Sequence, residues 1–409
     1  MRILITTDWY KTAVNGVATS VKNLEKGLKS CGAEVRILTL SPSYHSYVRG
    51  NVTFISSLNA DKIYPNARVT ALARHKYLKA LVDWEPDIIH SQCEFSTFVM
   101  ARYIAKRASC PIVHTYHTIY EDYTHYLFHN KRLGRNALRT FTNQISKRVD
   151  GMIAPTDKVS ELLIRYGCHT PIWTMPTGLD IERITDSSTA ETKAALRKKW
   201  NIPDNNKILL YAGRLAEEKN IEEIIRFLGN IRPENVTFLI VGDGPSRKNI
   251  EAAINDNALD FAIMTGMVEQ HKMKHYYGIA DIFVNASQSE TQGLTYIEAL
   301  ANGLPLLCRR DKCLENILID GKTGYGYTSE EDFEKNLKLM LGTELKEMSE
   351  NAKTLVSENY SLEKFAECAL KIYKTCITNY APSEHIITTF LPKLPKLPKI
   401  SLRFKGVSH

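Results

Sequence analysis

Two glutamates, Glu290 and Glu298, lie eight positions apart around the expected start of a helix. Residues 281–285 form a short apolar run that predicts a strand, the polar residues after it predict a loop, and an apolar periodicity from Leu294 onward predicts a helix. The first turn of a helix has unpaired backbone N–H groups and the positive end of the helix dipole, so it can bind a phosphate. A carboxylate one turn into the helix could accept hydrogen bonds from a ribose. The spacing therefore indicates a nucleotide site, although two such glutamates also fit an acidic loop before a surface helix.

The complete string around these glutamates favours the nucleotide site. Residues 285–303 spell NASQSETQGLTYIEALANG, which resembles the E-x7-E signature of the retaining glycosyltransferases of family 4, and most closely of members that glucosylate diacylglycerol. The resemblance implies the α/β architecture called GT-B, in which two doubly wound Rossmann-like domains face a cleft. It also implies that Glu290 lies at the donor sugar, that Glu298 binds the ribose, and that the donor phosphates meet Gly293, Leu294 and Thr295.

A second motif, HTYHT at residues 114–118, follows a buried strand that begins near residue 111. Ligands of open α/β sheets gather beyond the carboxyl ends of the strands, so histidines there are well placed to act. One alternative is a metal pair of His114 and His117 with Glu121 or Asp122, and another is that His114 is a satisfied core histidine. The motif resembles a segment of the same glycosyltransferases, which implies that His117 lies beside the donor sugar.

Further donor-binding residues are implied by the same resemblance. The string GRLAEEK at residues 213–219 lies between an expected strand at 207–212 and an expected helix at 221–229. It resembles a family motif whose cations, here Arg214 and Lys219, bind the donor diphosphate. A glycine before the first helix, Gly16, lets backbone approach a ligand and faces the donor phosphates in related enzymes. The family position for backbone contacts to the nucleobase is occupied by Met267 and Val268.

No D-x-D metal motif is present, so the resemblance implies an enzyme that needs no metal cofactor, with UDP-glucose as a substrate. Positive side chains and the helix start can offset the charge of the leaving diphosphate in place of a metal. Mg²⁺ remains possible but is not predicted. We assign no covalent nucleophile, because related retaining enzymes are thought to react on one face of the sugar.

The charge is unevenly distributed along the chain. Residues 1–178 carry a formal net charge of +10, residues 179–380 carry −6 and residues 381–409 carry +4, which gives +8 in all. A basic half suits a polyanion, either nucleic acid or an anionic membrane surface. A nucleic-acid binder would need a recognition helix or aromatic-basic modules, and it would leave the two-glutamate motif unexplained, so no nucleic acid is expected.

Two basic segments are the candidates for contact with an anionic membrane. Residues 66–83 predict one helix with cations on its polar side, and most such helices are merely solvated. Residues 391–399, LPKLPKLPK, predict polyproline II with lysines along one edge, or else a disordered tail. The membrane-binding candidates in these two segments are Arg68, Arg74, Lys76, Lys79, Lys393, Lys396 and Lys399.

The length of 409 residues and 44% hydrophobic content indicate a globular protein of two or three domains. We expect an acceptor and membrane-docking domain at 1–178, a nucleotide-sugar domain at 179–360, a helix near 361–380 that crosses back to the first domain, and a basic tail at 381–409. No run of 18 apolar residues or signal peptide is found, and eight scattered cysteines fit reduced thiols. These features predict a cytoplasmic protein, peripheral on the inner face of the cell membrane.

The function implied by the resemblance is transfer of glucose from UDP-glucose to 1,2-diacylglycerol, which gives 3-O-α-glucosyl-diacylglycerol. The motifs do not separate this reaction from a second step that adds galactose or glucose to glucosyl-diacylglycerol. A sugar-nucleotide epimerase shares the architecture but needs neither a lipid nor a basic membrane face. The oligomeric state is not indicated by the sequence.

Overall fold

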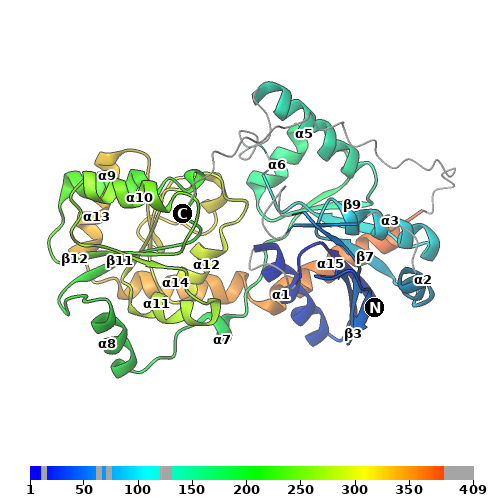
Figure 1. The fold of residues 1–409 in the computed structure, drawn as a ribbon, viewed down its shortest axis with the longest axis horizontal. Helices are drawn as coiled ribbons and strands as arrows, with labels where there is room; N and C mark the ends of the chain where they lie inside the picture. Colours follow the sequence, from blue (N-terminus) through cyan, green and yellow to red (C-terminus); the bar gives the residue numbers. More distant parts are fainter. Residues whose placement is uncertain (11–15, 61–66, 71–75, 120, 122–130, 382–409) are drawn as a thin grey trace.

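A computed structural model describes residues 1–10, 16–60, 67–70, 76–119, 121 and 131–381. These residues form two α/β domains that lie side by side (Figure 1). The fold class predicted from the sequence, two doubly wound domains with parallel sheets, is confirmed. None of the described helices is long and apolar enough to cross a lipid bilayer.

The sheet of the N-terminal domain has eight strands, all parallel except the edge strand β3. Its central strand β1 lies between β2 and β7, so the direction of winding reverses beside β1. In spatial order the strands are β10 (Ile172–Thr174), β9 (Gly151–Ala154), β8 (Ile112–Thr115), β7 (Ile88–Ser91), β1 (Arg2–Thr7), β2 (Glu34–Leu40), β4 (Val52–Ile55) and β3 (Tyr47–Arg49).

The sheet of the C-terminal domain has six parallel strands, and β11 lies between β12 and β14. All six residues of β12 are buried, as expected of a parallel strand covered on both faces. In spatial order the strands are β13 (Ala262–Gly266), β12 (Val236–Val241), β11 (Lys207–Ala212), β14 (Ile282–Asn285), β15 (Leu306–Arg309) and β16 (Gly324–Tyr327).

Helices cover both faces of each sheet and enclose four apolar clusters, one on each face. In the N-terminal domain they are α1 (Gly16–Ser30), α2 (Lys76–Asp83), α3 (Ser96–Ala108), α5 (Lys131–Ser146) and α6 (Asp157–Arg165). In the C-terminal domain they are α7 (Ile181–Ile184), α8 (Ala190–Lys199), α9 (Ile221–Ile231), α10 (Arg247–Asp256), α11 (Met273–Ile279), α12 (Leu294–Ala301), α13 (Glu330–Leu341) and α14 (Lys346–Asn359). The last described helix, α15 (Leu362–Asn379), packs on α1 of the first domain.

The two places where the chain passes between the domains lie against each other. The backbone N–H of Leu179 donates to the carbonyl of Tyr360 at 2.7 Å. Gly178 is packed so closely on α15 that an added Cβ would lie 2.6 Å from both Phe365 Cβ and the Ser361 carbonyl oxygen. These contacts join both crossings into one connection between the domains.

The single helix predicted over residues 66–83 is wrong at residues 68–69. Arg68–Val69 form the strand β6, which pairs antiparallel with β5 (Leu58–Asn59), whereas Lys76–Asp83 form the helix α2. The guanidinium of Arg68 donates through Nε to Ser57 Oγ at 2.6 Å and through Nη2 to the Ser57 carbonyl at 2.8 Å. Strand pairing and these side-chain bonds therefore hold Arg68 away from the helix that carries Lys76 and Lys79.

Candidate active site

The polar loops of the C-terminal domain gather at its topological switch point, between β11 and β14. In a parallel sheet the carboxyl ends of the strands meet at one edge, and ligands bind where the winding reverses. The loop after β11 contains Arg214 and the short 3-10 helix η2 (Glu217–Lys219). The loop after β14 contains Glu290 and leads into α12. The fold thus places both predicted donor-binding loops side by side.

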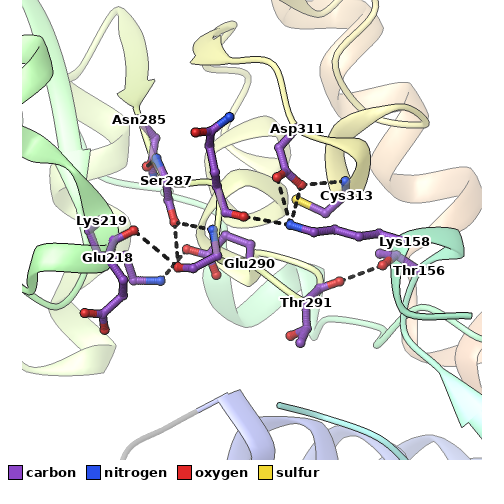
Figure 2. A network of polar contacts seen from close by, with 12 residues as sticks. Thr156, Lys158, Glu218, Lys219, Asn285, Ser287, Glu290, Thr291, Asp311 and Cys313 are labelled. Carbon is purple, nitrogen blue, oxygen red and sulfur yellow. Dashed lines mark hydrogen bonds and ion pairs between the residues drawn. The ribbon is translucent and has the colours of Figure 1, made fainter. Parts of the chain in front are cut away.

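The ion pair between Lys219 and Glu290 joins these two loops (Figure 2). Lys219 Nζ lies 2.5 Å from Glu290 Oε1, and the two side chains are only 16% and 17% exposed. A second contact, from Ser289 Oγ to the Glu218 carbonyl at 3.3 Å, lies beside it. The cation predicted for the diphosphate and the carboxylate predicted for the donor sugar are therefore bonded to each other, so substitution of either one also changes the other.

Two helices begin at the junction of the domains. Gly293 precedes α12 with a φ of +71°, and an added Cβ would lie 2.3 Å from the ring of Tyr296, so this turn requires glycine. Gly16 begins α1, and a Cβ added there would lie 3.8 Å from Leu294 Cδ1. The first turns of α1 and α12 thus lie close together, with Thr295 half-buried in the latter. The N–H groups in the first turn of a helix suit an anion.

Glu298 lies one turn into α12 and is half-buried. The hydroxyl of Tyr277 on α11 donates to Glu298 Oε2 at 2.9 Å. Burial raises the pKa of Glu298 to about 7, and the bond from Tyr277 only partly offsets this effect. The carboxyl group therefore changes its charge close to neutral pH.

His117 extends from the chain beyond β8 in the N-terminal domain and is half-buried. Its Nε2 lies 2.6 Å from Gln92 Oε1, and because that atom is a carbonyl oxygen, Nε2 is the donor. Burial lowers the pKa of His117 to about 4; the Glu94 carboxylate opposes this lowering and His114 adds to it. His117 is thus a neutral imidazole at pH 7.

The sequence left two alternatives for these histidines, a core position for His114 and a metal site that contains both His114 and His117. His114 is fully buried, with Nδ1 3.2 Å from Ser91 Oγ, which agrees with a core position. Its Nε2 lies 3.6 Å from Glu94 Oε1. Within the described part of the chain, no group of three His, Cys, Asp or Glu side chains is arranged to hold a metal ion. Asp122, which was weighed as a ligand, lies outside the described residues.

The remaining predicted donor-binding residues differ in exposure. Arg214 is exposed, and its carbonyl accepts from the Tyr211 hydroxyl at 3.0 Å, which fixes the backbone of the turn. Met267 is 79% exposed after β13, whereas Val268 packs on the apolar cluster under α12.

The predicted membrane-binding residues are placed only in part. Lys76 and Lys79 are exposed on α2, and Arg68 is half-buried on β6. Arg74 and the tail lysines Lys393, Lys396 and Lys399 lie outside the described residues.

Sequence reasoning missed two groups of residues. One is a set of exposed apolar side chains on the N-terminal domain, of which Phe95 and Phe141 stack with ring centroids 6.3 Å apart. The other is Thr156 and Lys158, which the string PTD at residues 155–157 indicated only as a helix start. Neither group has a local signal, because each depends on contacts between distant parts of the chain.

Known proteins resemble this chain over most of its length. The family model Glycosyltransferase Family 4 matches residues 14–183, and the model Glycosyl transferases group 1 matches residues 192–355. The alpha-monoglucosyldiacylglycerol synthase of Streptococcus pneumoniae is 34% identical over 81% of this chain and 76% of its own length. The synthase of the same name from Acholeplasma laidlawii is 32% identical over 91% of this chain and 96% of its own length.

Solved structures share the fold at lower sequence identity. A glycosyltransferase from Rickettsia africae superposes with a TM-score of 0.71 at 20% identity, over 92% of this chain and 99% of its own. The sucrose-phosphate synthase of Thermosynechococcus elongatus gives 0.70 at 18% identity, with the same coverage of both chains. These likenesses confirm the GT-B arrangement of two Rossmann-like domains.

Replacing Glu298 by glutamine tests its environment. Burial raises its pKa from 4.5 to about 7, so ionisation costs more free energy in the folded protein than in the unfolded chain. Glutamine keeps an oxygen for Tyr277 but cannot ionise. The wild type should therefore lose up to about 3 kcal/mol of stability relative to Glu298→Gln as the pH rises through this interval, and nothing below it. Urea unfolding of both proteins measures the difference. A difference that does not vary with pH would contradict the raised pKa.

Proposed function

This chain belongs to glycosyltransferase family 4, and we propose that it transfers glucose from UDP-glucose to 1,2-diacylglycerol. The product is 3-O-α-glucosyl-diacylglycerol, with the anomeric configuration retained. The observation that carries this proposal is the identity of 32–34% to two alpha-monoglucosyldiacylglycerol synthases, one of them matched over 96% of its length. Their name describes a single α-linked glucose on diacylglycerol. A second-step enzyme acting on glucosyl-diacylglycerol is the alternative.

The donor would lie at the switch point of the C-terminal domain. Arg214 and the first turn of α12 supply positive charge for the diphosphate, while Glu298 accepts from the ribose hydroxyls. Lys219 has three N–H donors, so it can bind a phosphate oxygen while it keeps its bond to Glu290. Met267 and Val268 would present their backbone to the uracil.

The reaction would occur on one face of the sugar, between the two domains. The bond from the anomeric carbon to the diphosphate oxygen breaks, and a bond from the same carbon to the acceptor oxygen forms on the same side. The leaving diphosphate oxygen takes the proton of the acceptor hydroxyl. Glu290 and the neutral His117 would hold the sugar hydroxyl groups, which keeps the anomeric carbon placed between donor and acceptor.

We also propose that no divalent metal is required. The cations and the helix start described above can stabilise the diphosphate by fixed electrostatic contacts. Activity measured in EDTA, which removes divalent metal ions, tests whether the transfer reaction requires one.

Product analysis tests the proposed reaction. Purified protein is offered UDP-glucose or UDP-galactose, each with diacylglycerol or glucosyl-diacylglycerol vesicles, in EDTA and in Mg²⁺. We expect α-glucosyl-diacylglycerol from UDP-glucose and diacylglycerol in both media, identified by mass and by the anomeric NMR coupling. Product only from glucosyl-diacylglycerol would favour the second-step enzyme. Activity lost in EDTA and restored by one divalent ion would overturn the metal-free proposal.

Arg214→Ala tests the diphosphate contact, with Arg226→Ala as its matched control. Both guanidinium groups are exposed, and Arg226 lies on α9 over the ring of Phe227, outside the proposed site. Loss of a charge-assisted bond to the leaving group should lower kcat/KM about ten- to hundredfold. Arg226→Ala should leave it near the wild-type value. Equal values for both variants would remove Arg214 from the site.

We further propose that the N-terminal domain docks on the cytoplasmic face of an anionic membrane. Exposed apolar side chains form two pairs: Leu58 lies opposite Val69 in the β5–β6 ribbon, and Phe95 stacks on Phe141. The Thr70 amide, next to β6, donates to Ser96 Oγ, next to Phe95, at 3.1 Å, and this bond links the two pairs. Apolar side chains rimmed by cations suit a lipid surface.

The helix α5 also carries two exposed cations. Arg135 and Arg139 are exposed on the helix that also carries Phe141. Each cation near an anionic leaflet contributes about 1 kcal/mol, and salt screens it over about 8–10 Å. The basic tail at 381–409 would add to the same attraction. The cytoplasmic side is supported by eight cysteines that are all free thiols.

Charge reversal tests the docking surface. Arg135→Glu/Arg139→Glu should weaken co-sedimentation with vesicles rich in anionic lipid at least about tenfold. The matched control is Lys335→Glu/Lys346→Glu, which changes the net charge equally at exposed positions of the C-terminal domain. The control should bind like the wild type. Equal weakening by both variants would mean that only net charge matters and would contradict docking through α5.

A further inference from the structure

The loop that carries Glu290 is held by side chains of the other domain. Lys158 Nζ, on α6, donates to the Gln288 carbonyl at 2.8 Å and to both carboxylate oxygens of Asp311 at 2.8 Å. Thr156 Oγ1 donates to the Thr291 carbonyl at 2.7 Å. Figure 2 shows these contacts on one side of the loop and the bond from Lys219 to Glu290 on the other. Two backbone carbonyls that flank Glu290 are thus fixed from the N-terminal domain.

These contacts are largely sheltered from water. The side chains of Lys158 and Asp311 are 19% and 8% exposed, and Asp311 Oδ1 also accepts from the Cys313 amide at 2.8 Å. A sheltered, hydrogen-bonded ion pair is directional and weakly screened by salt, unlike an exposed one. Lys158 therefore fixes the position of the Gln288 carbonyl as well as joining the domains.

Thr156 occupies a position where its hydroxyl ordinarily serves its own helix. It is the N-cap residue of α6, and a threonine there usually accepts a hydrogen bond from the first turn. Its side chain makes no capping bond and instead donates to the other domain. The local sequence favours a cap, and the tertiary contact takes its place.

A second ion pair also joins α6 to the segment at residues 311–312, but it does not contact the loop that carries Glu290. Lys312, on the 3-10 helix η4 (Lys312–Leu314), pairs with Glu161 on α6, and both side chains are more exposed, at 39% and 54%. This pair can contribute to adhesion between the domains, but it reaches no carbonyl beside Glu290. A variant of this pair therefore tests the effect of adhesion alone, without a change in the contacts to the loop.

We propose that Thr156 and Lys158 are positioning residues that couple the apposition of the domains to the placement of Glu290. When the domains are in contact, Lys158 and Thr156 donate hydrogen bonds to the Gln288 and Thr291 carbonyls, and the Glu290 carboxylate between them lies beside Lys219. When the domains separate, both hydrogen bonds are lost together. The donor sugar would then be held for reaction only while the acceptor domain is in place. This inference rests on the proposed function, because it assigns Glu290 to the donor sugar.

Hydrogen exchange tests the coupling without any assay of activity. The variants are Thr156→Val, which keeps the side-chain shape, and Lys158→Met/Asp311→Asn, which leaves no buried charge unpaired. Both should speed exchange of the backbone amides at residues 286–293 about tenfold, because each loses a bond to the loop. Thr156→Ser keeps the hydroxyl and should exchange like the wild type. Glu161→Gln, the matched control for adhesion, should also leave these amides unchanged.

Kinetics of the same variants test the consequence for the reaction. Thr156→Val and Lys158→Met/Asp311→Asn should lower kcat about tenfold or more while KM for UDP-glucose changes little, because the loop acts at the reacting sugar. Glu161→Gln should keep the wild-type kcat. Equal exchange and equal kcat in the loop variants and in Glu161→Gln would overturn the coupling. If the wild type itself transfers no glucose to diacylglycerol, the proposed function fails, while the exchange comparison still decides the coupling.

Discussion

A parallel sheet covered by helices on both faces leaves little room for polar chemistry except at the ends of its strands. This constraint governs both domains, whose central strands β1 and β11 are buried between apolar clusters. Polar side chains accordingly gather in the loops beyond the carboxyl ends, at the points where the winding reverses. The loops that follow β9 and β14 meet at the junction of the domains, where Thr156 Oγ1 donates to the Thr291 carbonyl at 2.7 Å, and we propose that the donor loops and His117 contribute to one site there.

Several of the charges predicted for the donor site are paired or close to neutral. Lys219 and Glu290 neutralise each other, His117 is kept neutral by burial, and Glu298 has a pKa close to neutrality. Arg214 is exposed, and the backbone at the starts of α1 and α12 adds partial positive charge. A diphosphate would thus meet fixed dipoles and an exposed guanidinium, and little reorganisation of charge would be required.

The sequence predicted the parts of the molecule that depend on local pattern. The bounds of β11 agree with the strand expected at 207–212, and the loop-to-helix transition located the start of α12. The sequence pattern did not predict the contacts between residues that lie far apart in the chain. Arg68 forms a strand because β5 is available as a partner, and the bonds from Lys219 to Glu290 and from Thr156 to Thr291 span 71 and 135 positions of the chain. No local periodicity specifies such pairs.

The double crossing between the domains has a mechanical consequence. A single linker would leave one domain free to swivel about it, whereas here two chain segments are joined by the bond from Leu179 to Tyr360 and are wedged against α15 by Gly178. Two adjacent attachments define an axis, so the relative movement of lowest free-energy cost is a hinge rotation of one domain about that axis. Sideways slip and torsion would first have to separate the attachments. The opposed surfaces would therefore return to the same alignment each time they meet.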